Sequence, residues 1–339
     1  MRTLALVLAM AALPVLAAEE VEIDGRLHVR NPATPPGGIE TIELEELWRL
    51  GGEDGDLLLG LPTGLGVDAA GFVYVLDAQL NQVHVLSPDG VLLDTRSREG
   101  DGPGEMRNPS DLIVWPDGGI GVVQEYPGYV IRLDGAGDPL PSLHPGGATE
   151  EGGFGVLMNG RLRGDNLVLC GMMTRFDDEG QRIRRNYLAS YGEDGLERVA
   201  YVENTVLRDT EQAPGEKDIL QPFALAWALA PDGRVVIPLD WTRYALRVVG
   251  PQGGLERVIE REYEPWRRTD EDRRFLLRLM GVPEDAPPPM ELAEYEPTIS
   301  LLQGGVQVSE NGEIWVLTSR GVRNLPEGVL ARFDVFDPE

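Results

Sequence analysis

Side chains that could hold a cation lie in three loops, each of which follows a short apolar run. Asp77 and Asn81 flank the first loop, while Glu125 and Asp240 lie in two later ones. Carboxylate and amide oxygens are the ligands that calcium prefers in proteins. Their spacing does not demand a metal site, however. We therefore predict no bound cofactor or metal, with calcium as the alternative.

Aromatic and arginine side chains in or beside the same set of loops indicate ligand binding. They include Tyr129 and Arg323. Such groups recognise ligands by stacking and by paired hydrogen bonds, although they could equally plug a channel or cap the edges of sheets. The candidate binding residues are Asp77, Asn81, Tyr126, Asp240, Trp241, Arg243 and Arg320. No catalytic residue is assigned.

Motifs for several known chemistries are absent or incomplete. The three histidines, His28, His84 and His144, lack metal-ligand spacing. There is no Gly-x-Ser-x-Gly element, and the glycine-rich residues 100–104 lack the Gly-Lys-Ser/Thr ending of a phosphate loop. Cys170 is the only cysteine and lies in an apolar run. The sequence therefore predicts a buried structural thiol and no internal disulfide.

These loops belong to a repeating pattern whose first unit spans residues 61–108. The unit contains four short apolar runs, each followed by a turn signal such as Asp-Ala-Ala-Gly or Ser-Pro-Asp-Gly. Four later segments repeat the pattern, beginning near positions 109, 155, 224 and 305. We interpret each unit as one four-stranded blade of a β-propeller. The sequence thus predicts an all-β fold with five readable blades.

The register of the units is set by one turn residue in each. These residues are Gly71, Gly118, Asp165, Gly233 and Gly312. The first two steps between them are 47 residues each, and the later steps are longer because of insertions at 204–221 and at about 264–298. We assign residues 39–339 to a single propeller domain that contains these insertions.

The second insertion predicts a helix that begins at Thr269 and ends at Gly281. Thr269 and Asp272 have the spacing of a weak capping box. Four apolar residues share one face of this helix: Phe275, Leu276, Leu279 and Met280. The helix could pack over an apolar blade surface or cover the mouth of a central channel, and the two possibilities are compatible.

Antiparallel strand order sorts the connections onto two faces of the propeller. Turns after the first and third strands of each unit are short and uniform. Loops after the second and fourth strands are long and varied, and they include residues 172–185 and both insertions. We call this second side the variable-loop face. Because ligands usually bind propellers at the mouth of the channel, we expect function there.

The fifth unit has no fourth strand before residue 339. Residues 39–50 alternate with period two around positions 41–44, which favours an edge strand, and a helix at 43–49 is the alternative. Such a strand could complete the fifth unit and close a five-bladed ring. Otherwise the sequence stops short of a sixth blade. The preceding residues, 19–38, are predicted to be a leader and linker with one strand around 26–30.

The net charge and the N-terminal sequence indicate which partners are excluded and where the protein is located. The formal net charge of −27, from 30 basic and 57 acidic residues, argues against nucleic acid and anionic membranes as partners. Arg2, an apolar run at 4–16 and two small residues predict a signal peptide over residues 1–18. We expect an exported monomer, periplasmic or extracellular, with no membrane span.

Residues 67–77 and 83–90 resemble NHL-type propeller repeats. The connector at 100–106 and the run at 333–338 are similar to exported bacterial six-bladed β-propeller proteins, which mostly have no assigned function. The resemblance covers about residue 40 to the end and implies architecture, not chemistry. Members of that family usually carry a sixth blade after the last turn. Related propeller lactonases hold calcium with Glu, Asn and Asp in the channel.

Three functions remain open from the sequence. The first is an exported, non-catalytic propeller that binds a small molecule or a protein through the variable-loop face around the channel. The alternative is a calcium-dependent hydrolase or lyase, lactonase-like, with its site in the channel. The third is a structural ring used in surface assembly.

Overall fold

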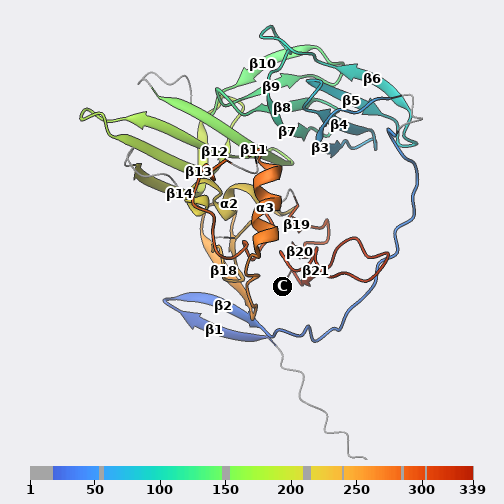
Figure 1. The fold of residues 1–339 in the computed structure, drawn as a ribbon. Coiled ribbons are helices and arrows are strands. Elements are labelled where there is room, and N and C mark those ends of the chain that lie inside the picture. Colours follow the sequence, from blue (N-terminus) through green and yellow to red (C-terminus); the bar gives the residue numbers. More distant parts are fainter. Residues whose placement is uncertain are drawn as a thin grey trace, which may run out of the picture.

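The computed structural model describes residues 18–52, 57–146, 153–208, 215–238, 240–283, 286–301 and 304–338. The predicted signal peptide, apart from its last residue, lies outside the described residues. Nearly all regular structure is β-strand, in five sheets that follow one another around a curved row (Figure 1). None of the helices in the described ranges is long and apolar enough to cross a lipid bilayer.

The strands form one sheet per predicted unit, in chain order. Blade one holds β3 (Pro62–Val67), β4 (Val73–Asp77), β5 (Gln82–Leu86) and β6 (Leu92–Arg96), and blade two holds β7 (Pro109–Val114), β8 (Ile120–Gln124), β9 (Tyr129–Leu133) and β10 (Pro139–Leu143). Blade three holds β11 (Phe154–Arg163), β12 (Asn166–Phe176), β13 (Arg182–Tyr191) and β14 (Glu197–Arg208). Blade four holds β15 (Ala228–Leu229), β16 (Val235–Pro238), β17 (Ala245–Val249) and β18 (Leu255–Arg261), and blade five holds β19 (Val306–Val308), β20 (Ile314–Leu317) and β21 (Phe333–Phe336).

Short helices occupy the two insertions. Helices α1 (Glu216–Ile219) and α2 (Pro222–Leu225) follow blade three, and α3 (Asp270–Leu279) follows blade four. The inner strands β3, β7, β11, β15 and β19 contact one another in that order. This succession of radially packed antiparallel sheets is a β-propeller, and the predicted fold class is confirmed, including its five blades and its helical insertion.

Each pair of neighbouring blades is joined by its own apolar cluster. Between blades one and two the cluster includes Leu76 and Val122. Further clusters join blades two and three, three and four, and four and five. Cys170 is fully buried in the cluster between blades three and four, and burial raises the pKa of its thiol. The predicted buried thiol is therefore confirmed.

Glycines on the inner strand of blade one allow blade two to approach closely. A Cβ atom added at Gly64 would lie 2.7 Å from the Cβ of Leu112, and one added at Gly66 would lie 2.4 Å from a methyl carbon of Val114. Both distances are shorter than any relaxed carbon–carbon contact. The branched side chains of one blade therefore fill the space that the missing side chains of the other leave open.

The N-terminal residues that were predicted as a leader contain a hairpin, β1 (Glu19–Ile23) and β2 (Arg26–Asn31). Strand β2 pairs in parallel with β18, so the sheet of blade four has six strands in the order β1-β2-β18-β17-β16-β15. The side-chain amide of Asn31 donates to the backbone carbonyl of Glu260 at 3.1 Å. The hairpin thus extends the outer edge of blade four.

Two secondary-structure predictions were wrong. Residues 39–50 form neither a strand nor a helix, and they do not complete blade five, whose described strands number three. Their alternating pattern finds no backbone partner among the described residues. The long loop predicted at 172–185 is instead mostly strand, because β12 and β13 pair from Leu167 with Tyr191 out to Phe176 with Arg182.

The close approach of blade two to Gly64 provides a test of how the blades are held together. We expect Gly64→Ala to lower the free energy of unfolding by about 1–3 kcal/mol, because the new methyl group overlaps blade two. The matched control is Gly254→Ala, since no atom lies within 4 Å of a Cβ added there. The control should change stability by less than about 0.5 kcal/mol. Urea denaturation of both variants measures the difference, and equal effects would contradict the packing described.

Candidate functional site

The predicted binding residues lie on the variable-loop ends of four different blades. Trp241 and Arg320 both contact the second insertion, and Arg243 lines a groove beside it. The other predicted binding residues do not line the groove. Two adjoining features, the groove and the base of the insertion, therefore make up the candidate site on blades four and five.

Asp77 is a structural carboxylate. It is fully buried and accepts four backbone N–H groups at 2.6 to 3.1 Å, from Gly60, Leu61, Gln79 and Leu80. Burial raises the pKa of Asp77, but these donors outweigh it and hold the pKa below its usual value. The side chain fixes its own loop and the chain that enters blade one, so its oxygens are already used.

The remaining candidates also have local roles or stand apart. Asp240 accepts the backbone N–H groups of Thr242 and Arg243, each at 2.9 Å. Asn81 adopts a positive φ of 54°, and its Oδ1 is buried with no hydrogen-bond partner among the described residues. Tyr126 is exposed and packs edge-on against Phe154, with 6.1 Å between the ring centroids. These side chains do not converge on one point.

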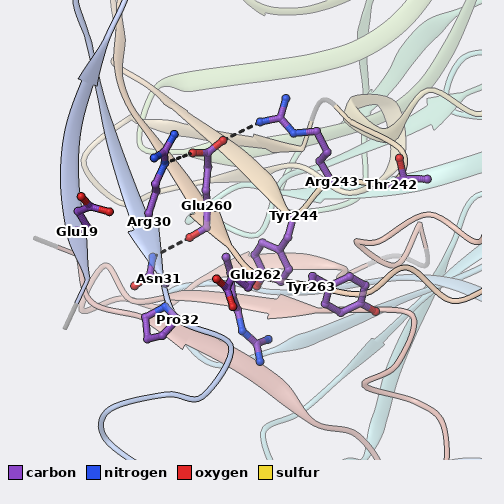
Figure 2. A pocket seen from close by; sticks show the side chains of 11 residues that line it. Glu19, Arg30, Asn31, Pro32, Thr242, Arg243, Tyr244, Glu260, Glu262 and Tyr263 are labelled. Carbon is purple, nitrogen blue, oxygen red and sulfur yellow. Dashed lines mark hydrogen bonds and ion pairs between the residues drawn. The ribbon is translucent and has the colours of Figure 1, made fainter. Parts of the chain in front are cut away.

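A groove of about 650 Å³ opens at the variable-loop end of blade four (Figure 2). One wall is the N-terminal hairpin, and the other is the loop after β16 together with the chain leaving β18. Its lining includes charged groups of both signs and two tyrosines. The lining residues are Glu19, Arg30, Asn31, Pro32, Thr242, Arg243, Tyr244, Glu260, Arg261, Glu262 and Tyr263.

Glu260 lies at the centre of the polar side of this groove. Its carboxylate is 3.2 Å from Nδ1 of His28 and 3.5 Å from Nε of Arg30, and it accepts a bond of 2.8 Å from Arg243. Burial raises the pKa of Glu260, but the hydrogen bond from His28 and the neighbouring cations outweigh it and lower the pKa. Glu260 therefore stays ionised and orients the two arginines.

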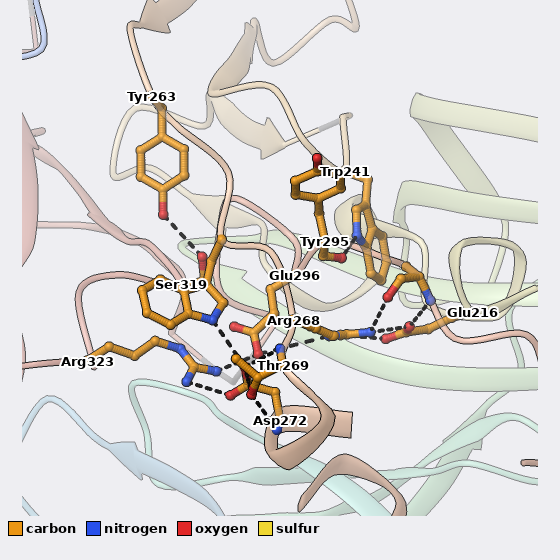
Figure 3. Close-up of polar contacts among 12 residues, drawn as sticks. Glu216, Trp241, Tyr263, Arg268, Thr269, Asp272, Tyr295, Glu296, Ser319 and Arg323 are labelled. Carbon is orange, nitrogen blue, oxygen red and sulfur yellow. Dashed lines mark hydrogen bonds and ion pairs between the residues drawn. The ribbon is translucent and has the colours of Figure 1, made fainter. Parts of the chain in front are cut away.

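The base of the insertion is held by a buried ion pair (Figure 3). Arg268 and Glu216 are only 5% and 2% exposed, and the two guanidinium nitrogens donate to both carboxylate oxygens at 2.5 and 2.8 Å. Glu216 also accepts the backbone N–H of Ala293 at 2.8 Å. The pair joins the first insertion to the second, with every oxygen of the carboxylate used.

A second set of ion pairs fastens the insertion to blade five. Arg323 donates to Glu296 at 2.5 Å and to Asp272 at 2.9 Å. Burial raises the pKa of Asp272, but hydrogen bonds from Thr269 and Trp266 and the charge of Arg323 outweigh it, and the pKa falls to about 2. In contrast, burial raises the pKa of Glu296 despite its two arginine neighbours.

Aromatic side chains complete this attachment. The indole N–H of Trp241 donates to the carbonyl of Tyr295 at 2.8 Å, and the guanidinium of Arg320 lies 5.2 Å from the ring of Trp266. The hydroxyls of Tyr263 and Ser319 are 3.1 Å apart. Tyr263 thus lines the groove and also contacts the loop that holds the insertion base, so the two features share this side chain.

Helix α3 begins as predicted, with the reciprocal Thr269–Asp272 capping box formed. Figure 1 shows the helix inside the curve of the row of blades, between the labels of β11 and β19. Phe275 and Met280 are exposed, however, so much of the predicted apolar face is not packed on a blade. Within the described ranges, no group of three or more His, Cys, Asp or Glu is arranged to hold a metal ion.

Most of the lining was not expected from the sequence. Arg30 belongs to the predicted leader, and no local pattern shows that this strand pairs with β18, more than two hundred residues away. Glu260 lies near the end of an ordinary fourth strand, and Tyr263 lies two residues beyond it. The sequence did place Arg243 in a loop after a second strand, and the structure places Arg243 in the lining of this groove.

No protein-family model and no curated protein matches this sequence. Solved structures similar to it include virginiamycin B lyase from Staphylococcus aureus, which is 11% identical over 81% of this chain and 69% of that one, with a TM-score of 0.35. A putative exported protein from Bacteroides fragilis is 9% identical over 85% of this chain and 74% of that one, with a TM-score of 0.39. The β-propeller domain of Cps50 (Swd1) from Myceliophteria thermophila is 10% identical over 82% and 72%, also with a TM-score of 0.39.

The buried ion pair gives a prediction for stability. Arg268→Met should lower the free energy of unfolding by about 3–5 kcal/mol, because it leaves Glu216 buried without its counter-charge. The neighbouring Arg267→Met removes only a surface pair with Glu294 and should cost less than about 1 kcal/mol. Chemical denaturation followed by tryptophan fluorescence measures both. Similar losses in the two variants would show that the buried pair does not hold the insertion.

Asp272 gives a prediction for pH. Because its pKa is lower in the folded protein than in the unfolded chain, its contribution to stability is complete above the unfolded pKa of about 3.9. That contribution disappears as the pH falls through the folded value of about 2. The stability difference between the wild type and Asp272→Asn should therefore be largest at pH 5 and shrink towards pH 2. Thermal unfolding of both proteins between pH 5 and pH 2 measures this trend.

Proposed function

We propose that this chain is an exported, non-catalytic binding propeller of the NHL-like type, delivered by its signal peptide to the periplasm or the exterior. It binds a ligand in the groove at the variable-loop end of blade four. The supporting observation is the arrangement of Arg30 and Arg243 around Glu260 beside Tyr263. This site lies at the outer edge of blade four, away from the channel mouth that sequence considerations favoured.

The chemistry of the groove favours a ligand that carries a carboxylate next to an apolar or aromatic group. Arg243 is largely exposed and bonds only one oxygen of Glu260, so it can turn to a ligand at little cost, since exposed ion pairs contribute about 0–1 kcal/mol. Arginine binds a carboxylate in a planar, two-bond arrangement. Tyr263 and Tyr244 supply aromatic lining to the same groove. Peptides with a free C-terminus have this combination.

The geometry gives less support to a calcium-dependent hydrolase or lyase. The candidate calcium ligands named for that function were Asp77, Asn81, Glu125 and Asp240. Asp77 and Asp240 instead accept backbone N–H groups in their own loops, on blades one and four. Their oxygens hold the loop conformations and are not directed at a common point.

Calorimetric titration with short peptide acids and the matching peptide amides, each with one aromatic residue, tests the proposal. We expect the acids to bind at least about tenfold more tightly, because only they offer a carboxylate to Arg243. Arg243→Gln should abolish this preference. The control Arg198→Gln removes an exposed arginine on blade three and should leave it unchanged.

Two outcomes would contradict the binding proposal: no peptide acid binds at millimolar concentration, or binding is the same in Arg243→Gln. Treatment with a chelator tests the alternative function, a calcium-dependent enzyme. Dialysis against EDTA should leave the midpoint of thermal unfolding unchanged. A clear drop that calcium restores would favour the calcium-dependent enzyme instead.

A further inference from the structure

The outer half of the six-stranded sheet of blade four carries basic side chains on one face. Arg247 of β17 pairs with Val258 of β18, which in turn pairs with His28 of β2. Paired residues lie on the same side of a sheet, and so do residues two positions apart on one strand. We call the basic residues that share this side the basic face of blade four: Arg26, His28, Arg30 and Arg247.

Two members of the basic face have no counter-charge. One carboxylate, that of Glu260, lies 3.2 Å from Nδ1 of His28 and 3.5 Å from Nε of Arg30, so it serves both of those side chains. Arg26 and Arg247 are exposed, and neither forms an ion pair with any residue that the structure describes. The positive charge that remains on this face therefore belongs to these two arginines.

The strand positions beside the two arginines on the basic face are apolar. On β1, Ile23 pairs with Arg26, and on β16, Ile237 pairs with Arg247. Val258 lies on the strand between the two arginines. These neighbours offer no carboxylate to either guanidinium group.

The acidic side chains of this region are directed elsewhere. Glu20 and Glu22 alternate with Ile23 along β1, so they lie on the opposite face of the sheet. Glu256 of β18 is turned to the hairpin that precedes it, with Oε1 2.5 Å from the position of a Cβ added at Gly250. The two arginines thus share one face without a carboxylate between them.

The charges of the two arginines repel each other. Burial and the charge of Arg26 both lower the pKa of the Arg247 guanidinium. Arginine nevertheless stays protonated in proteins, so the loss of a proton does not relieve this repulsion. A bound anion would relieve it, because an opposite charge favours the charged form of both groups. Such a local excess of positive charge contrasts with the net charge of −27 of the whole chain.

We propose that Arg26 and Arg247 form a binding site for a phosphate group, either the free ion or a phosphate ester. The two arginines come from strands on either side of β18, about 10 Å apart by the spacing of neighbouring strands. A tetrahedral phosphate has at least three free oxygens, so two guanidinium groups can donate to it from opposite sides. A planar carboxylate has two oxygens, which one arginine already occupies. The site is separate from peptide binding at Arg243 and does not depend on it.

Calorimetric titration of the full chain with inorganic phosphate and with glycerol phosphate tests the proposal. We expect Arg26→Gln and Arg247→Gln each to weaken binding about tenfold or more, because each removes charged hydrogen-bond donors. The control Arg175→Gln removes an exposed arginine of blade three and should leave the affinity unchanged. Tighter binding of glycerol phosphate would assign the site to an ester, and tighter binding of inorganic phosphate would assign it to the free ion.

Three results would overturn the proposal. The first is that neither phosphate binds at about 10 mM. The second is that Arg26→Gln and Arg247→Gln bind phosphate as tightly as the wild type or the Arg175→Gln control. The third is that phosphate binding is lost in Arg243→Gln, because the anion would then occupy the groove that Arg243 lines. We expect phosphate binding by Arg243→Gln to equal that of the wild type.

Discussion

The seam between neighbouring blades is the interaction on which the rest of this structure depends. Each sheet is too thin to bury its own side chains, so its apolar residues become core only when another blade covers them. Gly64 and Gly66 show how close that approach is, since neither tolerates a Cβ against blade two. The loops, insertions and groove are all carried by sheets fixed in this way.

The groove depends on a contact of a different kind. Its two walls come from segments more than two hundred residues apart, and the parallel pairing of β2 with β18 places them side by side. Glu260 then ties the walls together through Arg30 and Arg243. On the other side, Tyr263 is held by the insertion base, where the buried pair of Arg268 with Glu216 leaves little freedom.

Local patterns predicted the blades well because strand alternation and turn glycines are local properties. Gly71 and Gly118 adopt positive φ values of 85° and 83°, which is why their positions set the register. The same patterns failed where the outcome depended on a distant partner. Residues 41–44 have a strand pattern but pair with no strand among the described residues, whereas residues 172–176 continue as strand because β13 runs beside them.

The candidate site was only partly predictable, for the same reason. Arg243 was placed on the correct end of blade four because loop position follows from strand order. Asp77 was chosen for its carboxylate, which in the structure accepts four backbone N–H groups from two chain segments. The sequence alone does not show that these segments meet. Arg30 was missed, because no local sequence pattern shows that it lies next to Glu260, 230 positions away.

That separation also sets the order in which the molecule can be completed. The hairpin of β1 and β2 is synthesised before any blade, but the edge it joins belongs to β18, near the end of the fourth blade. Contacts so distant in sequence form late, because the intervening chain must first be ordered. Until then β2 is an uncovered strand edge, the kind of surface that chaperones shield and that aggregation exploits. The groove is consequently among the last parts of the molecule to form, because it requires the fourth strand of blade four.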